Sequence, residues 1–432
     1  MCALHPSKGK RLPIRSRQDG IALPLVIVGL LAILAVAGLA LDSSHALANK
    51  TRLQNTVDAA ALAAAKVLSL PSDTTQATAA AMNVLGQNAD GPGNHELNEA
   101  YDAGEINVIV QYSETLNPFT PGALNGPYVR VIAQNFNIQT TLSRVLGVDQ
   151  MPVAASAVAG PSPTIEVCNV APLVVCADDL SQPYFGFQQN ELRVLKNRPG
   201  DHEDVGPGNF KLLRLDCESG GGGACIRENM AGGVNVCPMS EDDTVETEPG
   251  VTQGPTAQGF NTRFGIYQGG GVNPEDYPPD VVGDTAPSPS LQSGPKNTPD
   301  EDKIFQGGVE KQTADQINYQ FGDANTSQTY VYDSLHGVHQ YPPPQGSYGR
   351  RVMAMPVADC TGDDSGQSTL KVEGFACYFM LQPVTGGGES EMEIFGQFVD
   401  GCLSSGIPGP DPSDAKGPFR IQLYKDPDSN DS

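Results

Sequence analysis

The side chains that most often bind metals or perform catalysis are sparse in this sequence. Of six histidines, only His336 and His339 stand close enough in the chain to share a zinc ion. Gly337 lies between them, three prolines follow, and the sequence offers no evident third ligand. We therefore interpret this HGVH pair as part of a loop, and His202, in the sequence HED, as part of a solvated turn.

Adjacent acidic residues offer the chain's other route to a metal ion. Asp178 and Asp179 are neighbours, and so are Glu241, Asp242 and Asp243. Carboxylates of this kind bind calcium when they alternate along an Asp-x-Asp-x-Asp-Gly loop, and no such loop occurs. We interpret both groups as acidic loop residues and predict no metal site.

A run of four glycines, Gly220–Gly223, could be mistaken for a phosphate-binding loop. It lacks the Gly-Lys-Ser/Thr ending and shows no helical pattern after it. A flexible hairpin tip is the simpler interpretation, and a disulfide between Cys217 and Cys225 would close it. No G-x-S-x-G motif occurs either. We expect no catalytic residues, no cofactor and no enzymatic activity.

An uncharged apolar segment, Ile21–Leu41, must position everything that follows it. Its 21 residues would span roughly 30 Å as a helix, about the hydrocarbon thickness of a bilayer. A cleavable signal peptide is the alternative, but Leu39–Leu41 is a poor cleavage site. Five basic residues and one acidic residue precede the segment, which places residues 1–20 in the cytoplasm. We predict a single-span protein whose body is extracytoplasmic.

The cysteines and the charge fit an exported body. The net charge is −24, and because residues 1–20 are basic the remainder is still more acidic, so nucleic-acid binding is not expected. No C-x-x-C pair favours zinc, whereas an even number of cysteines beyond the span favours disulfides, with connectivity open. The disulfide candidates are Cys168, Cys176, Cys217, Cys225, Cys237, Cys360, Cys377 and Cys402.

The sequence predicts that the apolar segment continues as a helix. No Pro or Gly interrupts Asp42–Leu70, Pro71 ends it, and six of the seven residues Ala59–Ala65 are alanine. Further elements are expected in the order helix, strand, strand, short helix stopped by Gly147, and strand. Their ranges are Asp73–Leu85, Ile106–Tyr112, Tyr128–Phe136, Thr140–Leu146 and Met151–Ala159, with a domain boundary at Gly160–Pro163.

The second half of the chain reads as a β-rich domain with long loops. Residues 239–302 are dominated by Pro, Gly and acidic or hydroxyl side chains, and the tail from Pro408 is polar and expected to fray. The expected strands are Val167–Val175, Phe210–Leu215, Arg351–Val357, Leu370–Gln382 and Glu391–Val399. The predicted fold class is α+β, with one transmembrane helix that continues as a long helix on a small sheet, followed by a disulfide-rich domain.

The N-terminal region resembles TadG-like proteins of the tight-adherence (Flp) pilus assembly system. The match runs through Arg17–Ala65, including Gly20 before the span, GLALD leaving it, and RLQN followed by DAAAL. The segment Val129–Gly160 also resembles the family, and Cys168–Cys176, Gly206–Phe210 and Pro249–Phe264 are similar to parts of some TadG-like ectodomains. The resemblance implies a pilin-like TadE/G-type module over residues 42–160 and an extracytoplasmic domain over residues 161–432.

The resemblance also implies function and location. It predicts a structural scaffold of Flp pilus assembly and secretion in the bacterial inner membrane, with its body in the periplasm. Its partners would be pilin-like subunits, the assembly platform or the outer-membrane channel, and the lipid bilayer through Ile21–Leu41. A membrane-anchored adhesin or cation-dependent surface-binding module is the alternative.

Two features depart from the family pattern. Prepilins carry Glu five residues after the processed glycine, where this chain has Leu25, and Pro24 lies beside it. We therefore expect an unprocessed N-terminus. The Asp-x-Ser-x-Ser motif of a von Willebrand factor A metal site is not recognisable either.

Overall fold

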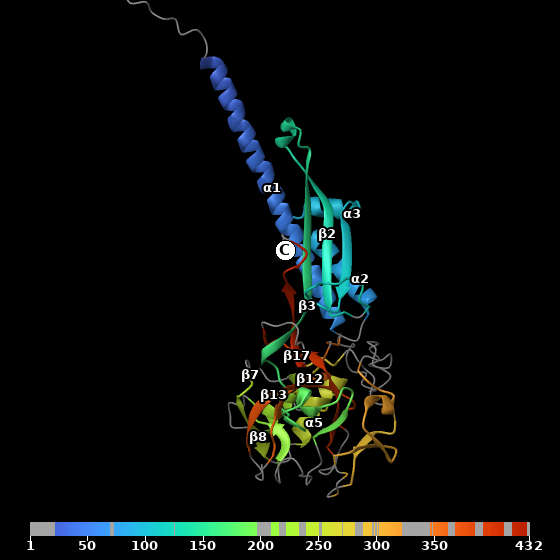
Figure 1. The fold of residues 1–432 in the computed structure, drawn as a ribbon. Coiled ribbons are helices and arrows are strands. Elements are labelled where there is room, and N and C mark those ends of the chain that lie inside the picture. Colours follow the sequence, from blue (N-terminus) through green and yellow to red (C-terminus); the bar gives the residue numbers. More distant parts are fainter. Residues whose placement is uncertain are drawn as a thin grey trace, which may run out of the picture.

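The structure is a computed structural model in which a long helix projects from a small module that leads into a larger sheet-rich domain (Figure 1). It describes residues 22–69, 73–124, 126–196, 209–215, 222–232, 239–249, 253–269, 271–280, 288–295, 298, 300, 302–321, 346–347, 349–361, 368–384, 392–409 and 417–429. The predicted fold class is confirmed: a long apolar helix is followed by an α+β body with disulfides.

A single helix, α1 (Ala22–Leu68), carries the apolar segment into the body without a break. Pro24 lies in its first turn, where a proline removes no intrahelical hydrogen bond. From Leu53 onward one face of α1 is buried, and most of the buried side chains on it are alanines. The predicted continuity of the apolar segment with the long helix is therefore confirmed.

Two shorter helices lie against the second half of α1. Helix α2 (Thr74–Ala89) begins at Asp73, whose carboxylate accepts a hydrogen bond from the N–H of Gln76 at 2.8 Å. Its buried face is also built from small residues, Ala77, Ala81 and Ala89, with Leu85. Helix α3 (His95–Asp102) follows, so three helices and a sheet enclose one core.

The sheet of this module is an antiparallel meander that the C-terminal strand completes. Its order is β1 (Asn107–Ser113), β2 (Tyr128–Gln139), β3 (Gln150–Val167), β17 (Gly417–Tyr424) and β15 (Gly401–Leu403). Two short strands, β7 (Met239–Ser240) and β16 (Ile407–Pro408), pair with the far end of β3. We call α1 from Asp42 onward, α2, α3, β1–β3 and β17 the proximal module.

The end of this module differs from the expectation in two places. The residues of the expected domain boundary, Gly160–Pro163, lie within a strand, because β3 continues through them and pairs with β17 from Val158 to Pro163. The pairing of β3 with β2 ends at Ala159. Pro161 and Pro163 lack an N–H group, but they are two residues apart and therefore on the same side of the strand, so Ser162 between them can still take part in the ladder with β17. The tail is not frayed over residues 417–424, because β17 forms this ladder and also contacts α1.

The remaining chain forms a second body, the distal domain, which lies at the end of the molecule away from the free half of α1 (Figure 1). Its main sheet has the order β4 (Val175–Cys176), β12 (Val352–Ala358), β13 (Thr369–Met380), β14 (Ile394–Val399) and β5 (Leu192–Lys196). Strands β6 (Asn209–Leu213) and β8 (Thr244–Pro249) extend it. The expected strand Val167–Val175 is wrong, since β3 ends at Val167 and β4 begins only at Val175.

Each face of this sheet carries its own hydrophobic core. Helices α4 (Gly223–Gly232), α5 (Gln253–Asn261) and η3 (Thr262–Phe264) pack on one face. A small sheet of β9 (Leu291–Ser293), β10 (Ile304–Gln306) and β11 (Val309–Lys311), with η4 (Ala314–Ile317), packs on the other. Residues 239–302 are thus not only acidic loops, because single buried residues such as Val245, Phe260 and Leu291 hold short elements there.

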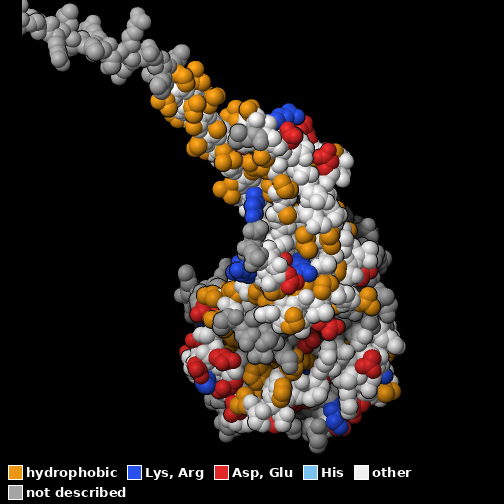
Figure 2. All heavy atoms as spheres, turned by 45° about the horizontal axis from the view of Figure 1, so that its top comes forward, with side chains coloured by type: hydrophobic (Ala, Val, Ile, Leu, Met, Phe, Trp, Pro, Cys, Tyr) orange, Lys and Arg blue, Asp and Glu red, His pale blue; other side chains and the backbone are white. Residues whose placement is uncertain are grey.

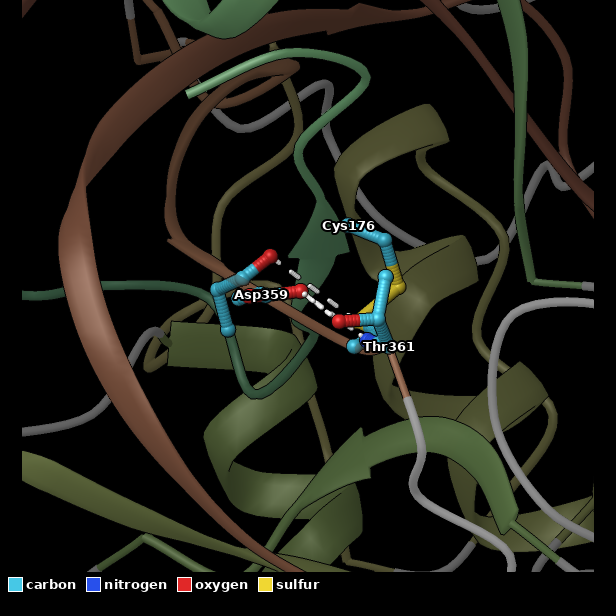
Figure 3. The surroundings of a disulfide bond; sticks show 5 residues. Cys176, Asp359 and Thr361 are labelled. Carbon is cyan, nitrogen blue, oxygen red and sulfur yellow. Dashed lines mark hydrogen bonds between the residues drawn. A yellow bond between two sulfur atoms is a disulfide. The ribbon is translucent and has the colours of Figure 1, made fainter. Parts of the chain in front are cut away.

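Disulfides tie the distal domain together and to its neighbour. Cys176 is bonded to Cys360 next to a turn in which Asp359 accepts hydrogen bonds from Thr361 (Figure 3). Cys377 in β13 is bonded to Cys402 in β15, so this bond joins the distal sheet to the sheet that contains β17. Cys168 and Cys225 are also disulfide-bonded, and Cys217 and Cys237 lie outside the described residues.

Candidate functional site

The most distinctive surface of the molecule is the first half of α1, which is apolar and exposed. It is the one helix, among the residues described, that is long and apolar enough to cross a membrane. Hydrophobic side chains cover this projecting part of the helix (Figure 2). Its exposed large side chains are Leu25, Val26, Ile27, Val28, Leu30, Leu31, Ile33, Leu34, Val36, Leu39 and Leu41.

The second half of α1 is a strip of small residues on which the sheet lies. Ala60, Ala61 and Ala64 are fully buried and share a core with Val129, Ala157 and other residues of β2 and β3. Alanine keeps the helix stable and lets the sheet backbone approach closely. The same rod is therefore a free apolar helix at one end and the spine of the proximal module at the other.

Asp42 marks the point where the two halves of α1 meet. Its carboxylate is buried and accepts hydrogen bonds from three consecutive backbone N–H groups, Thr141–Ser143, at 2.5–3.1 Å. These hydrogen bonds, led by that of Ser143, lower the pKa of Asp42 from 3.8 to about 2. One helical turn earlier, Gly38 lies so close to Leu142 that a Cβ on it would be 2.7 Å from the Leu142 Cβ. The tip of the β2–β3 hairpin is thereby fixed to α1.

Two further polar contacts fix the helix along its length. The Asn49 amide donates to the Glu96 carboxylate of α3 at 2.7 Å, and the His45 ring lies 3.0 Å from the same oxygen. Gln54 donates to the backbone carbonyl of Ser156 in β3 at 2.8 Å. Each hydrogen bond forms only when its donor and acceptor face each other. Together they therefore fix the rotation of α1 and its position along its axis relative to α3 and β3.

The C-terminal end of the chain is held by a buried arginine. Arg130 of β2 donates to the side chain of Gln111 at 2.8 and 3.0 Å and lies over the Phe119 ring at 4.3 Å. It also forms ion pairs with Asp426 and Asp428, just after β17. The last described residues are therefore part of the proximal module, and the distal domain is an insertion between β3 and β17.

The structure places the sequence-predicted candidates in separate locations. Asp178 pairs with Arg193, and Asp179 accepts hydrogen bonds from the backbone and side chain of Ser181, which lower its pKa. Asp242 pairs with Lys371 at 2.8 Å. Over the described ranges, no group of three or more His, Cys, Asp or Glu side chains could hold a metal ion. His202, His336 and His339 lie outside those ranges.

The prediction for the glycine run is wrong where the structure describes it. Helix α4 begins at Gly223, so a helix does follow the run. The apolar residues Ile226 and Met230 of this helix are buried four residues apart, which is the spacing of one helical face. Two apolar residues in a short polar segment are a weak helix signal, which is why the sequence did not predict α4.

A pocket of about 330 Å³ lies beside β12 and the residues that follow β15. Arg263 and Arg350 line it, and both donate hydrogen bonds to backbone carbonyls, Arg263 to Met230 at 2.9 Å and Arg350 to Pro278 at 2.9 Å. The residues lining it include no His, Asp or Glu that could serve as an acid or base. Both arginines therefore support the local backbone.

Sequence reasoning missed two residues that organise the molecule. In the sequence Asp42 marks only the end of the uncharged segment, because its hydrogen-bond partners lie about a hundred residues away. Arg351 is fully buried and donates to the Met380 carbonyl and the Tyr319 hydroxyl at 2.6 and 2.9 Å. The signal in the sequence is a charged residue at the start of the expected strand Arg351–Val357, and it is a weak one.

Comparison with known proteins gives one match, and it falls on α1. No curated protein and no solved structure matches the chain. Residues 20–67 match the family model described as Flp pilus-assembly TadE/G-like. This range begins just before α1 and ends one residue before it does. The resemblance to TadG-like proteins is confirmed on the helix that joins the apolar segment to the proximal module.

Proposed function

We propose that the chain is a membrane-anchored scaffold of Flp pilus assembly and secretion. Helix α1 would span the inner membrane, and the proximal module and distal domain would lie in the periplasm. The partners would be pilin-like subunits, the assembly platform or the outer-membrane channel. We assign no enzymatic step to the chain.

The continuity of α1 is the observation that carries this proposal. One half of this 47-residue helix is free and apolar, and the other half is buried under a sheet. Hydrogen bonds of Asp42, Asn49 and Gln54 hold the helix to the rest of the proximal module. The second half therefore cannot rotate or slide without breaking these contacts. Such a rod sets the distance and direction from the bilayer to the distal domain, which is what a scaffold requires.

The family match supports the same proposal from the sequence side. It covers the helix that would carry both the anchoring and the docking. The distal domain lies at the opposite end of the molecule from the free half of α1 (Figure 1). In this position it would be presented to partners that are far from the bilayer surface.

Deletion and complementation in the native bacterium test the proposal. Deleting the gene should abolish Flp pili and surface adherence, and the full chain should restore both. A matched variant, in which a cleavable signal peptide replaces residues 1–41, would export the body but release it from the membrane. We expect this variant not to restore pili. Normal piliation in the deletion strain, or full rescue by the released body, would contradict the proposal.

A further inference from the structure

We propose that the tip of the β2–β3 hairpin, residues 140–149, lies in the interface of the bilayer that α1 spans, as a second membrane contact of this chain. The inference rests on the membrane anchoring in the proposed function. In Figure 1 this hairpin extends beyond the rest of the sheet, alongside the free half of α1. The tip contains a short 3-10 helix, η1 (Ser143–Leu146), and is closed by Gly147 with φ 84°.

The position of the tip along α1 places it at the membrane boundary. The tip covers Asp42 and Gly38 of α1, both of which are buried. On α1 the partly buried residues extend from there to Ala35. Ala35 lies seven residues before Asp42, which corresponds to about 10 Å along a helix axis. Interfacial segments bury their apolar face ~5–10 Å into the headgroup and acyl boundary. The tip therefore reaches the depth at which such segments lie.

The side chains at the tip suit this location. Leu142, Val145 and Val148 are 45%, 87% and 41% exposed, respectively. Leu142 also contacts α1 at Gly38, so the apolar surface of the tip continues that of the membrane segment. The charged residues of the tip, Arg144 and Asp149, form an ion pair at 3.2 Å. An exposed apolar turn beside a membrane helix is stable when lipid, rather than water, covers it.

The backbone of the tip is also prepared for a less polar environment. Three N–H groups donate to Asp42, and that of Thr140 donates to the Asp149 carbonyl at 3.1 Å. Within the turn, the N–H groups of Val145, Gly147 and Val148 donate to preceding carbonyls. Unpaired backbone groups are costly near hydrocarbon, so internal pairing lowers the cost of placing this turn there.

A second contact would fix the orientation of the spine. A single helix can rotate about its own axis in a bilayer without losing burial. The turn is held against one face of α1 through Asp42 and Gly38, so the apolar surface around the helix is not the same on all sides. One rotation of α1 about its axis would therefore bury more apolar area in the bilayer than the others. The bilayer would thereby define the direction in which the proximal module and the distal domain face.

Tryptophan fluorescence in liposomes tests the inference, because the chain contains no tryptophan. The full-length protein is reconstituted in vesicles of phosphatidylethanolamine and phosphatidylglycerol, without bromine or with acyl chains that carry bromine either near the headgroup or near the bilayer centre. The reporter is Val145→Trp, and Val148→Trp repeats the measurement from the other side of the turn. Leu31→Trp reports insertion of α1, and Val309→Trp in β11 reports the aqueous phase, with both native side chains exposed, 60% and 58%.

We expect the emission of Val145→Trp and Val148→Trp to shift to shorter wavelength and to lose intensity in brominated vesicles, while Val309→Trp is unchanged. Loss of intensity for Leu31→Trp alone, with both tip reporters emitting like Val309→Trp, would overturn the inference and leave the anchoring intact. The tip would then be a surface for a protein partner. Failure of Leu31→Trp to respond would overturn the anchoring and the inference together.

Discussion

The proximal module and the distal domain are stabilised in different ways. In the proximal module, alanines on α1 and α2 bring helices and sheet close together, and a few polar contacts such as Asp42 and Gln54 set the register. In the distal domain, large side chains fill two cores around one sheet, and disulfides join distant segments. The proximal module is held by the close packing of a sheet on a continuous helix, whereas the distal domain also has covalent links from its strands to distant segments.

The family match lies on the helix that begins in the free apolar half and ends under the sheet of the proximal module. The matched residues 20–67 include no part of the distal domain. The match therefore describes α1, and the distal domain is the part of the chain that it does not describe.

The largest expected effect separates the two regions by removing a disulfide. Replacing Cys176 and Cys360 by alanine opens a link between residues 184 apart, for which chain entropy predicts a loss of about 5 kcal/mol in the distal domain. The proximal module should retain its stability, since its described core contains no cysteine. Hydrogen exchange measured by mass spectrometry should show faster exchange in β4, β12 and β13 but not in β2. Equal acceleration in both regions would remove the distinction.

A bulky residue on the alanine strip should reverse this pattern. Ala60 is fully buried under the sheet, so Ala60→Leu should destabilise the proximal module by about 2 kcal/mol through overpacking. Ala48→Leu, on an exposed position of the same helix, is the matched control and should have little effect. Limited proteolysis of the membrane-inserted protein measures both variants. Unchanged protease resistance of Ala60→Leu would show that the sheet does not pack closely on α1.

The contact between Arg130 and Asp426 tests whether the C-terminal segment belongs to the proximal module. Asp426 is buried and pairs with Arg130 at 3.3 Å, so Asp426→Ala should cost about 1–3 kcal/mol and increase exchange in β17. Lys425→Ala, one residue earlier and on no described ion pair, is the control. If β17 exchanges at the same rate in both variants, the segment is held mainly by its ladder with β3.

The smallest expected effect is local and depends on pH. Asp42 has a folded pKa of about 2 against an ordinary value of 3.8. A lowered folded pKa stabilises the native state above the unfolded pKa, and this contribution is lost as the pH falls from about 4 to about 2. Exchange at residues 140–148 should accelerate over this window, after correction for the intrinsic pH dependence of exchange. Asp42→Asn should abolish the pH-dependent part, and its persistence in that variant would assign it to another group.

The sequence predicted the proximal module better than the distal domain, for a physical reason. Helix propensity and the stop at Gly147 act within a few residues, and both are present in the structure. The ladder of β17 with β3 joins residues more than 250 positions apart, and the Gly-Pro-Ser-Pro sequence at residues 160–163 indicates a domain boundary when only its neighbours are considered. The alternation of Phe419, Ile421 and Leu423 with polar residues indicates a strand in this tail, but it does not show that the strand pairs with β3.

The organising contacts were harder to predict because each depends on a distant partner. A single acidic residue after an apolar segment predicts only where the segment ends, and the role of Asp42 requires the hairpin at residues 141–143. In the distal domain, Phe260 and Leu291 are isolated apolar residues in polar sequence, so no period marks them as buried. They become core residues only when β13 and its neighbours are in place.

Photo-crosslinking in intact cells tests the central claim most directly. A photoreactive amino acid replaces Leu31 or Leu47, both exposed on α1, and the captured proteins are identified by mass spectrometry. If the chain is a scaffold, we expect pilus-assembly components to be crosslinked from both positions. These crosslinks should be absent in cells that lack the pilus genes. Capture of the same proteins in both kinds of cell, with no pilus-assembly component among them, would contradict the scaffold role.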